Sequence, residues 1–176
     1  MVPVDHVNSR WAKALNCPVY ISAEDQEWLM RKDLAIQNCW TGSKQPILPR
    51  VTVVKVGGHF PGISSHLWLT PGSAVLHWDR SRDNLPSVIL TADSIMPLLN
   101  GMVSVMWSYP NFIGLGPDDM LSVWKKIKDV DFDWIYGGWY FVPVIKNGKP
   151  AILKSLQQIT EIMTKSKSHP IFTETI

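Results

Sequence analysis

The chain has few cysteines, little net charge and no long apolar run. Cys17 and Cys39 are its two cysteines, too few for a disulfide framework, and we expect both to be reduced thiols. The formal net charge of +2, with dispersed lysines, argues against the basic surface of a nucleic-acid-binding protein. No stretch reaches the ~20 apolar residues of a membrane helix, and the first residues do not resemble a signal peptide. These absences predict a cytoplasmic protein that binds neither nucleic acid nor membranes.

Tryptophan, by contrast, is abundant. The 176 residues include nine tryptophans, which are scattered without a period, and 45% of all residues are apolar. Large aromatic side chains bury much surface, so we expect most of them in a core and a minority in a pocket. The length suits one domain with a real hydrophobic core. We therefore expect a single domain over residues 1–164 and a polar tail over residues 165–176.

The first quarter of the chain alternates helix and strand. Residues 8–16 begin with capping residues and predict a short helix, and residues 18–21 predict a buried strand. A capping-box pattern then predicts a second helix over residues 22–30. Residues 32–49 are polar and interrupted by proline and glycine, which predicts a loop. This rhythm is typical of an α/β protein.

The rest of the chain reads as strands followed by more helix and strand. Apolar or β-branched runs predict strands at 50–56, 73–78, 87–93, 132–138 and 140–145. The polar residues 79–86 predict a hairpin loop. A helix is predicted over 116–130, with Met120, Val123, Trp124 and Ile127 on one face, and another over 151–163, with Ile152, Leu156, Ile159 and Met163 on one stripe. The order predicts layers of helix on sheet.

Four ionisable residues lie at a strand end or just before a helix. Asp5 and His6 precede the first predicted helix, His59 follows a strand and two glycines, and Asp93 closes the strand 87–93. Hydrolytic zinc sites use imidazoles and carboxylates on loops that follow strands, because the sheet fixes the geometry and the loops converge. A plainer interpretation stays open: Asp5 caps a helix, Asp93 ends a strand, and His59 is a loop histidine without a ligand role.

Two motifs resemble signatures of the metallo-β-lactamase-fold hydrolases. "GGHFPG" at 57–62 is followed by "VILTAD" at 88–93, and residues 5–29 resemble the helix–strand–helix segment that follows the family's His-x-His-x-Asp-His motif. The resemblance runs from residue 5 to about residue 140. It implies an αββα sandwich in which His59 and Asp93 bind one zinc ion. Asp5, His6 and Asp93 would bind a second, with Asp93 bridging the two.

The departures from the family pattern predict an incomplete zinc site. Met1 and Pro3 stand where the motif would place histidines, and the family's first sheet would precede them. Trp139 stands in a turn where the family's last histidine often sits, and residues 63–72 resemble an insertion. The resemblance therefore implies an N-terminally truncated sandwich that binds zinc weakly or not at all.

These observations predict a zinc-dependent hydrolase of a small-molecule lactone, ester or thioester, with impaired or lost activity. By resemblance Asp93 and Asp5 would be catalytic, and Trp107, Tyr109 and Trp139 would line the substrate cleft. One alternative is a non-catalytic α/β protein that binds a ligand or a partner. Another is an incomplete gene product whose uncovered apolar sheet face promotes aggregation. The sequence does not predict an oligomeric state.

Overall fold

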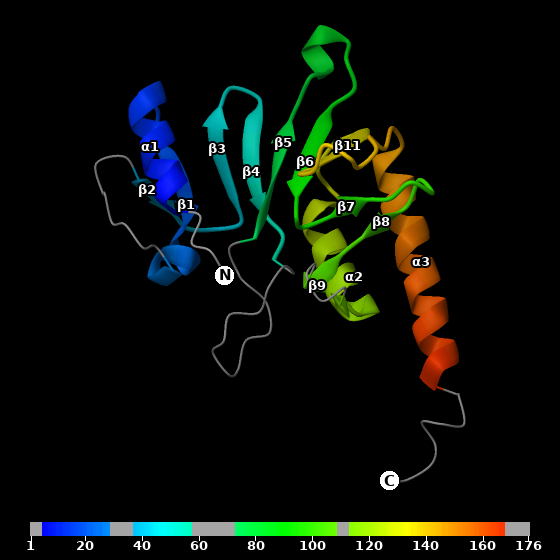
Figure 1. Ribbon diagram of the computed structural model, residues 1–176. Helices are drawn as coiled ribbons and strands as arrows, with labels where there is room; N and C mark the ends of the chain where they lie inside the picture. The colour runs from blue at the N-terminus through cyan, green and yellow to red at the C-terminus, as the bar shows by residue number, and fades with distance from the viewer. Residues whose placement is uncertain (1–4, 29–36, 58–72, 109–112, 168–176) are drawn as a thin grey trace.

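A five-stranded mixed sheet forms the middle of the chain, and two helices lie beside it (Figure 1). The computed structural model describes residues 5–28, 37–57, 73–108 and 113–167. In spatial order the strands are β11 (Trp134–Gly137), β6 (Val88–Ala92), β5 (Ala74–Trp78), β4 (Val51–Lys55) and β3 (Lys44–Leu48). Neighbours pair antiparallel except β11, which is parallel to β6. The helices are α2 (Pro117–Ile127) and α3 (Gly148–Lys167).

Smaller elements surround this sheet. The described residues also form three two-stranded sheets: parallel β1 (Val19–Ser22) with β2 (Gln37–Trp40), and antiparallel β7 (Met96–Pro97) with β8 (Val103–Ser104) and β9 (Met106–Ser108) with β10 (Ile113–Gly114). Helix α1 (Asp5–Leu15) precedes β1, and 3-10 helices follow at η1 (Ala23–Trp28) and η2 (Ser81–Asp83). The described part of the chain is thus a mixed α/β structure with more strands than helices. None of the described helices has the length and apolarity needed to cross a membrane.

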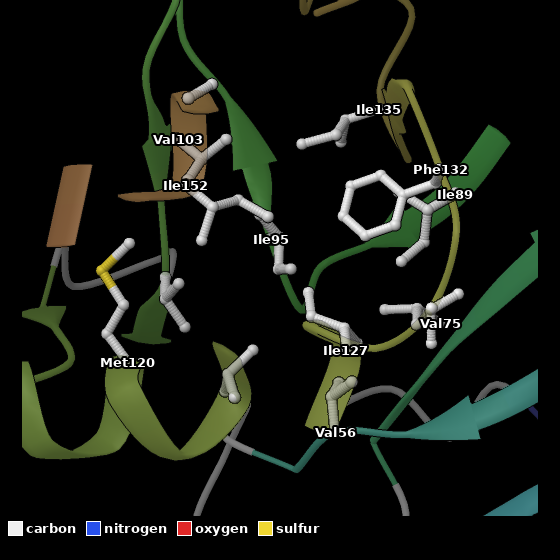
Figure 2. Packing of buried hydrophobic residues seen from close by; sticks show 14 of the residues in the cluster. Val56, Val75, Ile89, Ile95, Val103, Met120, Ile127, Phe132, Ile135 and Ile152 are labelled. Carbon is white, nitrogen blue, oxygen red and sulfur yellow. The ribbon is translucent and has the colours of Figure 1, made fainter. Parts of the chain in front are cut away.

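The hydrophobic core lies between one face of the large sheet and the helices (Figure 2). Four residues from β4, β5, β6 and β11 define this core face, and each is at most 2% exposed: Val54, Val75, Ile89 and Ile135. Helices α2 and α3 contribute the buried side chains of Met120, Ile127 and Ile152. Fully burying one such side chain contributes about 1.5–3 kcal/mol, so this layer is the main source of stability.

Helix α2 forms as the sequence predicts. Pro117 occupies the first turn, acidic residues follow it, and lysines occupy the last turn, an arrangement that complements the helix dipole. Of its four predicted core residues, Met120, Val123 and Ile127 are buried, and Trp124 packs partly against the core. Of the predicted stripe of α3, Ile152 is buried and Leu156 and Ile159 pack partly against the core, whereas Met163 is 42% exposed.

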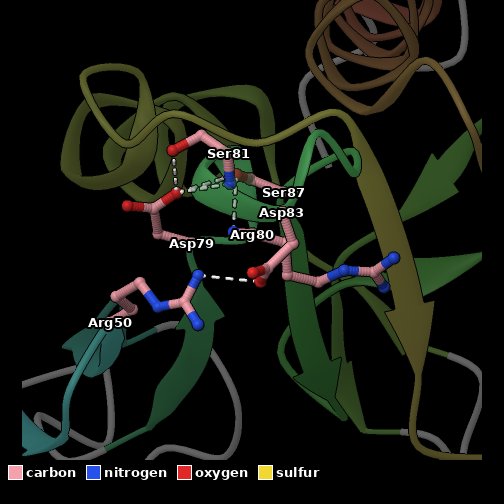
Figure 3. Close-up of polar contacts among 6 residues, drawn as sticks. All are labelled: Arg50, Asp79, Arg80, Ser81, Asp83 and Ser87. Atoms are coloured by element: carbon pink, nitrogen blue, oxygen red, sulfur yellow. Dashed lines mark hydrogen bonds and ion pairs between the residues drawn. The ribbon is translucent and has the colours of Figure 1, made fainter.

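The predicted hairpin loop between β5 and β6 is confirmed (Figure 3). Asp79 Oδ1 accepts hydrogen bonds from the backbone N–H (2.9 Å) and the hydroxyl (2.6 Å) of Ser81, which closes the turn. These bonds hold the pKa of the Asp79 carboxyl below its ordinary value. Arg50 Nη1 lies 2.8 Å from Asp83 Oδ2 and ties the loop to the start of β4.

Helix boundaries near the N-terminus differ from the prediction. Helix α1 begins at Asp5 instead of residue 8, so Asp5 and His6 lie in its first turn and not before it. The predicted helix over 22–30 is the shorter 3-10 helix η1.

Strand pairing corrects two further predictions. The predicted loop 32–49 contains β2 and β3. Although β3 contains Pro46, it is an edge strand, where a missing N–H is tolerated. Residues 140–145, predicted to be a strand, form a single bridge between Ile135 and Ile145. The local sequence pattern gave the wrong prediction for both segments, because pairing with a distant strand decides whether a segment forms a strand.

Candidate functional site

The predicted metal-ligand position Asp93 follows directly on strand β6. Ala92, the last residue of β6, has a φ of 44°, a left-handed conformation that costs a non-glycine residue energy. The buried hydroxyl of Thr91 contacts the carbonyl oxygens of Ile95 and Tyr136, the latter at 3.1 Å. These contacts join the end of β6 to the end of β11 and fix where the chain turns to present Asp93.

Trp139, just after β11, reaches this turn. Its indole N–H donates a hydrogen bond to Asp93 Oδ1, with an Nε1–Oδ1 distance of 3.1 Å. Gly138 permits the approach of the two strand ends, because a Cβ there would lie 3.0 Å from Ala92 Cα. Gly137 is packed for another reason, since a Cβ there would lie 2.7 Å from Val142 Cγ2.

The end of β4 meets the same edge of the sheet. The backbone N–H groups of Val56 and Gly57 donate to the carbonyl oxygen of Ser73, at 2.8 and 2.9 Å. The hydroxyls of Ser73 and Ser94 lie 2.7 Å apart, and Ser94 is the residue after Asp93. The segment that carries His59 thus leaves and re-enters the described structure beside the Asp93 turn.

Lys126 of α2 supports the end of β4 from the helix side. Its Nζ donates to the carbonyl oxygen of Val56 at 2.8 Å. Desolvation lowers the pKa of this lysine from its ordinary value. The contact anchors the strand at the point where the His59 segment begins.

The structure thus brings together two of the sequence-predicted site residues, Asp93 and Trp139. Asp5 and His6 belong to α1, and Trp107 to β9, but their side chains lie outside the described part. His59 and Tyr109 lie wholly outside the described residues. The convergence of His59, Asp5 and His6 on Asp93 therefore stays a prediction.

Sequence reasoning missed the polar residues that shape this edge. Thr91, Ser73 and Ser94 position the turn through hydrogen bonds between strand ends, and the sequence analysis assigned none of them to the site. The Gly-Gly pair before Trp139 was a usable signal, since paired glycines often mark a close backbone approach.

An exposed aromatic cluster borders the Asp93 turn. Trp139, Tyr140 and Phe141 are 45%, 99% and 62% exposed. The rings of Trp139 and Phe141 are nearly parallel with centroids 6.0 Å apart, and Tyr140 meets Phe141 edge to face at 5.4 Å. Exposed rings at a strand end offer an apolar surface, which suits an aromatic ligand.

A cavity of about 500 Å³ lies beside the start of α3 and is lined mainly by apolar residues, together with Lys146, Asn147 and Lys154. None of the sequence-predicted site residues lines it. We therefore place the candidate site at the Asp93 turn.

Zinc is the cofactor that the sequence resemblance implies, and the described residues do not fit it. Among them, no three His, Cys, Asp or Glu side chains lie close enough together to hold a metal ion. Asp93 Oδ1 accepts from the indole N–H of Trp139, a group that can donate but not coordinate. A catalytic zinc ion usually takes three protein ligands.

Comparisons with known proteins leave the family open. No protein-family model matches the chain. The uncharacterized protein YmaE of Bacillus subtilis (strain 168) is 29% identical over 161 residues, which are 90% of this chain and 54% of the relative. The chain thus spans about half the length of the curated relative it matches. The metallo-β-lactamase GOB-18 of Elizabethkingia meningoseptica aligns with 92% of this chain and 66% of its own, at 14% identity and a TM-score of only 0.41.

Proposed function

We propose that this chain is a metallo-β-lactamase-like protein that binds a small molecule at the Asp93 turn. In this proposal the chain is part of an αββα-sandwich fold. Its zinc-dependent hydrolysis of a lactone, ester or thioester is reduced or absent. The motifs around His59 and Asp93 support the relationship. The placement of Asp93 directly after a central strand, beside both ends of the His59 segment, supports the site.

The hydrogen bond between Trp139 and Asp93 is the observation that carries the proposal of reduced activity. A carboxylate that bridges metal ions needs further protein ligands beside it to complete the metal shell. Here the side chain beside Asp93 Oδ1 is an indole, whose N–H donates a hydrogen bond and cannot coordinate a metal. The same bond keeps Asp93 oriented at the strand end, so a binding site persists where the metal shell is incomplete.

Zinc content tests this proposal directly. We expect the purified chain to retain far less than one zinc ion per molecule by elemental analysis, and to turn over a lactone, ester and thioester panel slowly or not at all. Trp139→His replaces the N–H donor with a ligand and should raise zinc retention several-fold. Trp139→Phe is the matched control, because it removes the donor, keeps a ring and adds no ligand.

Two results would contradict the proposal. A stoichiometric, tightly held zinc ion with ready turnover in the unaltered chain would disprove the reduced activity. If Asp93→Ala, introduced into Trp139→His, left the raised zinc retention unchanged, the site itself would be misplaced. Circular dichroism of each variant separates loss of metal from loss of fold.

A non-catalytic ligand-binding protein is the second candidate, favoured by the exposed aromatic cluster. Here Tyr140, which is 99% exposed, would contact the ligand without stabilising the fold. Tyr140→Ala should weaken binding of an aromatic lactone several-fold, measured by quenching of tryptophan fluorescence, while Asp93→Ala and His59→Ala leave it unchanged. Under the hydrolase proposal, both of the latter substitutions abolish any metal uptake.

A further inference from the structure

The cavity beside the start of α3 has no part in the proposed function. Three segments border it: the turn that joins β7 to β8, the chain that follows β11, and the first turns of α3 (Figure 1). Each segment contributes apolar side chains, namely Leu98 and Leu99, Val144 and Ile145, and Ala151. The volume of about 500 Å³ lies within the roughly 300–1,000 Å³ of small-molecule pockets. The cavity is therefore large enough for a small organic molecule.

Hydrogen bonds hold the walls of this cavity in place. The N–H of Val103 in β8 donates to the buried Oγ of Ser155 in α3 at 2.8 Å, which ties the β7–β8 hairpin to the helix. Ile135 and Ile145 exchange backbone hydrogen bonds at 2.8 and 3.1 Å, which ties the third segment to β11. Walls that are fixed before a ligand arrives lose little conformational entropy when it binds.

The charge at the cavity is positive. Lys146 and Lys154 line it, and none of its described lining residues is acidic. Both lysines are exposed, and Lys146 Nζ lies 5.5 Å from the centroid of the Trp134 ring. Asn147, which directly precedes α3, and Pro150 in its first turn also line the cavity, so the positive end of the helix dipole lies beside it. The lysines and the helix N-terminus all favour an anion.

The apolar part of the lining is open to solvent on one side. Leu99 in the β7–β8 turn is 92% exposed and Val144 is 40% exposed, whereas Ile145 and Ala151 are buried. A single exposed leucine is ordinary on a protein surface. Here, however, the exposed apolar side chains border a concave surface that also carries two lysines. This combination fits a molecule with an apolar body and an anionic head group.

We propose that this cavity binds a monomeric amphipathic carboxylate, a small molecule with an apolar chain or ring and one carboxylate group. The apolar part packs against Leu99 and Val144, and the carboxylate faces Lys146 and Lys154. A lysine attracts an anion as a compact point charge. Affinity therefore depends on the charge and on the apolar body together. The inference is independent of the proposed function, because the cavity is not formed by the Asp93 turn.

Calorimetric titration with octanoate tests the inference. Octanol has a chain of the same length without the charge, and acetate has the head group without the chain. We expect one octanoate to bind per chain, at least tenfold more tightly than octanol or acetate. Its affinity should fall as salt is added, because salt screens exposed charges, while the affinity for octanol should not fall.

Substitutions of exposed lining residues assign the binding to this cavity. Lys146→Met combined with Lys154→Met should weaken octanoate binding at least tenfold, because both apolar stems stay and both ammonium groups are lost. The matched control is Lys125→Met, which removes an exposed lysine of α2 that does not line the cavity. Leu99→Ser should weaken octanoate binding several-fold and leave the circular dichroism spectrum unchanged.

The results separate this ligand from other anions. Octanoate binding that the double lysine variant removes and Lys125→Met preserves supports the inference. If the double variant fails to fold, the salt dependence and the comparison with octanol decide instead. Equal affinity for octanoate and octanol, or no binding at millimolar octanoate, overturns the inference. Tenfold tighter binding of octyl phosphate also overturns it, and so does sedimentation with phosphatidylglycerol vesicles without octanoate binding, because the ligand is then a phosphate or a membrane surface.

Discussion

The two faces of the five-stranded sheet have similar composition and different surroundings. On the core face, Val54, Val75, Ile89 and Ile135 are at most 2% exposed beneath α2 and α3. The opposite face, which we call the open face, carries Val53, Leu76, Leu90 and Tyr136 in one cross-strand row, and Leu90 is 40% exposed there. The difference teaches that side-chain type marks a face for burial, while burial itself depends on a second layer.

The comparison also separates two kinds of polar contact. Against the core face, the buried hydroxyl of Ser155 joins α3 to β8 by accepting from the Val103 N–H. At the corner of the open face, Lys55 and Glu24 make an ion pair whose carboxylate is 40% exposed. When the buried Ser155 contact is lost, no water can satisfy the Val103 N–H, so the loss should cost more free energy of unfolding. When the exposed Lys55–Glu24 ion pair is lost, water can solvate both groups, so the loss should cost less.

The largest expected effect comes from removing volume on the core face. Ile135→Ala should lower the free energy of unfolding by about 2–5 kcal/mol, because Ile135 is fully buried and the substitution leaves a cavity in the core. Leu90→Ala on the open face is the control and should cost about 1 kcal/mol or less. Urea denaturation measures both. Equal losses would mean that the two faces are packed alike.

Ser155→Ala should have an intermediate effect. Ser155 is fully buried, and its Oγ lies 2.8 Å from both Val103 N and the Ala151 carbonyl oxygen. Alanine leaves the Val103 N–H without its partner, which should cost about 1–3 kcal/mol of unfolding free energy.

Thr160→Ala is the control for this prediction. It removes an exposed hydroxyl that donates to the carbonyl four residues earlier in the same helix, and it should change stability by about 0.5 kcal/mol or less. A similar loss of unfolding free energy in Ser155→Ala and Thr160→Ala would show that the effect arises within helix α3 and not from its contact with β8.

The smallest effect is a pH dependence at the open corner. Hydrogen bonds from Lys55 and Ser22 lower the pKa of Glu24 from 4.5 to about 2. A carboxylate with a depressed folded-state pKa stabilises the fold fully above its unfolded pKa. That contribution is lost as the pH falls from about 4.5 toward about 2. Glu24→Gln should therefore flatten the stability curve in this window, measured by urea denaturation at successive pH values.

Lys55→Met tests the cause of this pH dependence. It keeps an apolar stem against Trp40 and removes the ammonium group that lowers the pKa of Glu24. The curve should flatten as in Glu24→Gln. An unchanged slope would show that Lys55 is not the main cause of the depressed pKa.

The sequence predicted the large sheet and its helices well. Four of its five strands and both helices of the core arise from local apolar patterns that the structure confirms. Strands β2 and β3 were missed, because they lie in a polar, proline-containing stretch, whereas β1 overlaps the strand predicted over residues 18–21. Their pairing partners, more than their own residues, make them strands.

The candidate site was predictable only in part. The end of "VILTAD" located Asp93 at a strand end, and the Gly-Gly-Trp turn singled out Trp139. Sequence assigned Asp93 to a metal and Trp139 to a cleft, and the structure joins them by a hydrogen bond. That bond depends on how closely β6 and β11 approach, and 46 residues separate Asp93 from Trp139.

The sequence by itself determined which segments alternate apolar and polar residues, because the periods of helix and strand are local properties. It also determined that both faces of the large sheet are apolar and that Asp93 follows a strand. Only the tertiary structure decided which face α2 and α3 cover, and that an indole N–H binds Asp93. Such choices depend on contacts between residues far apart in the chain, where strand register and backbone approach set which side chains meet.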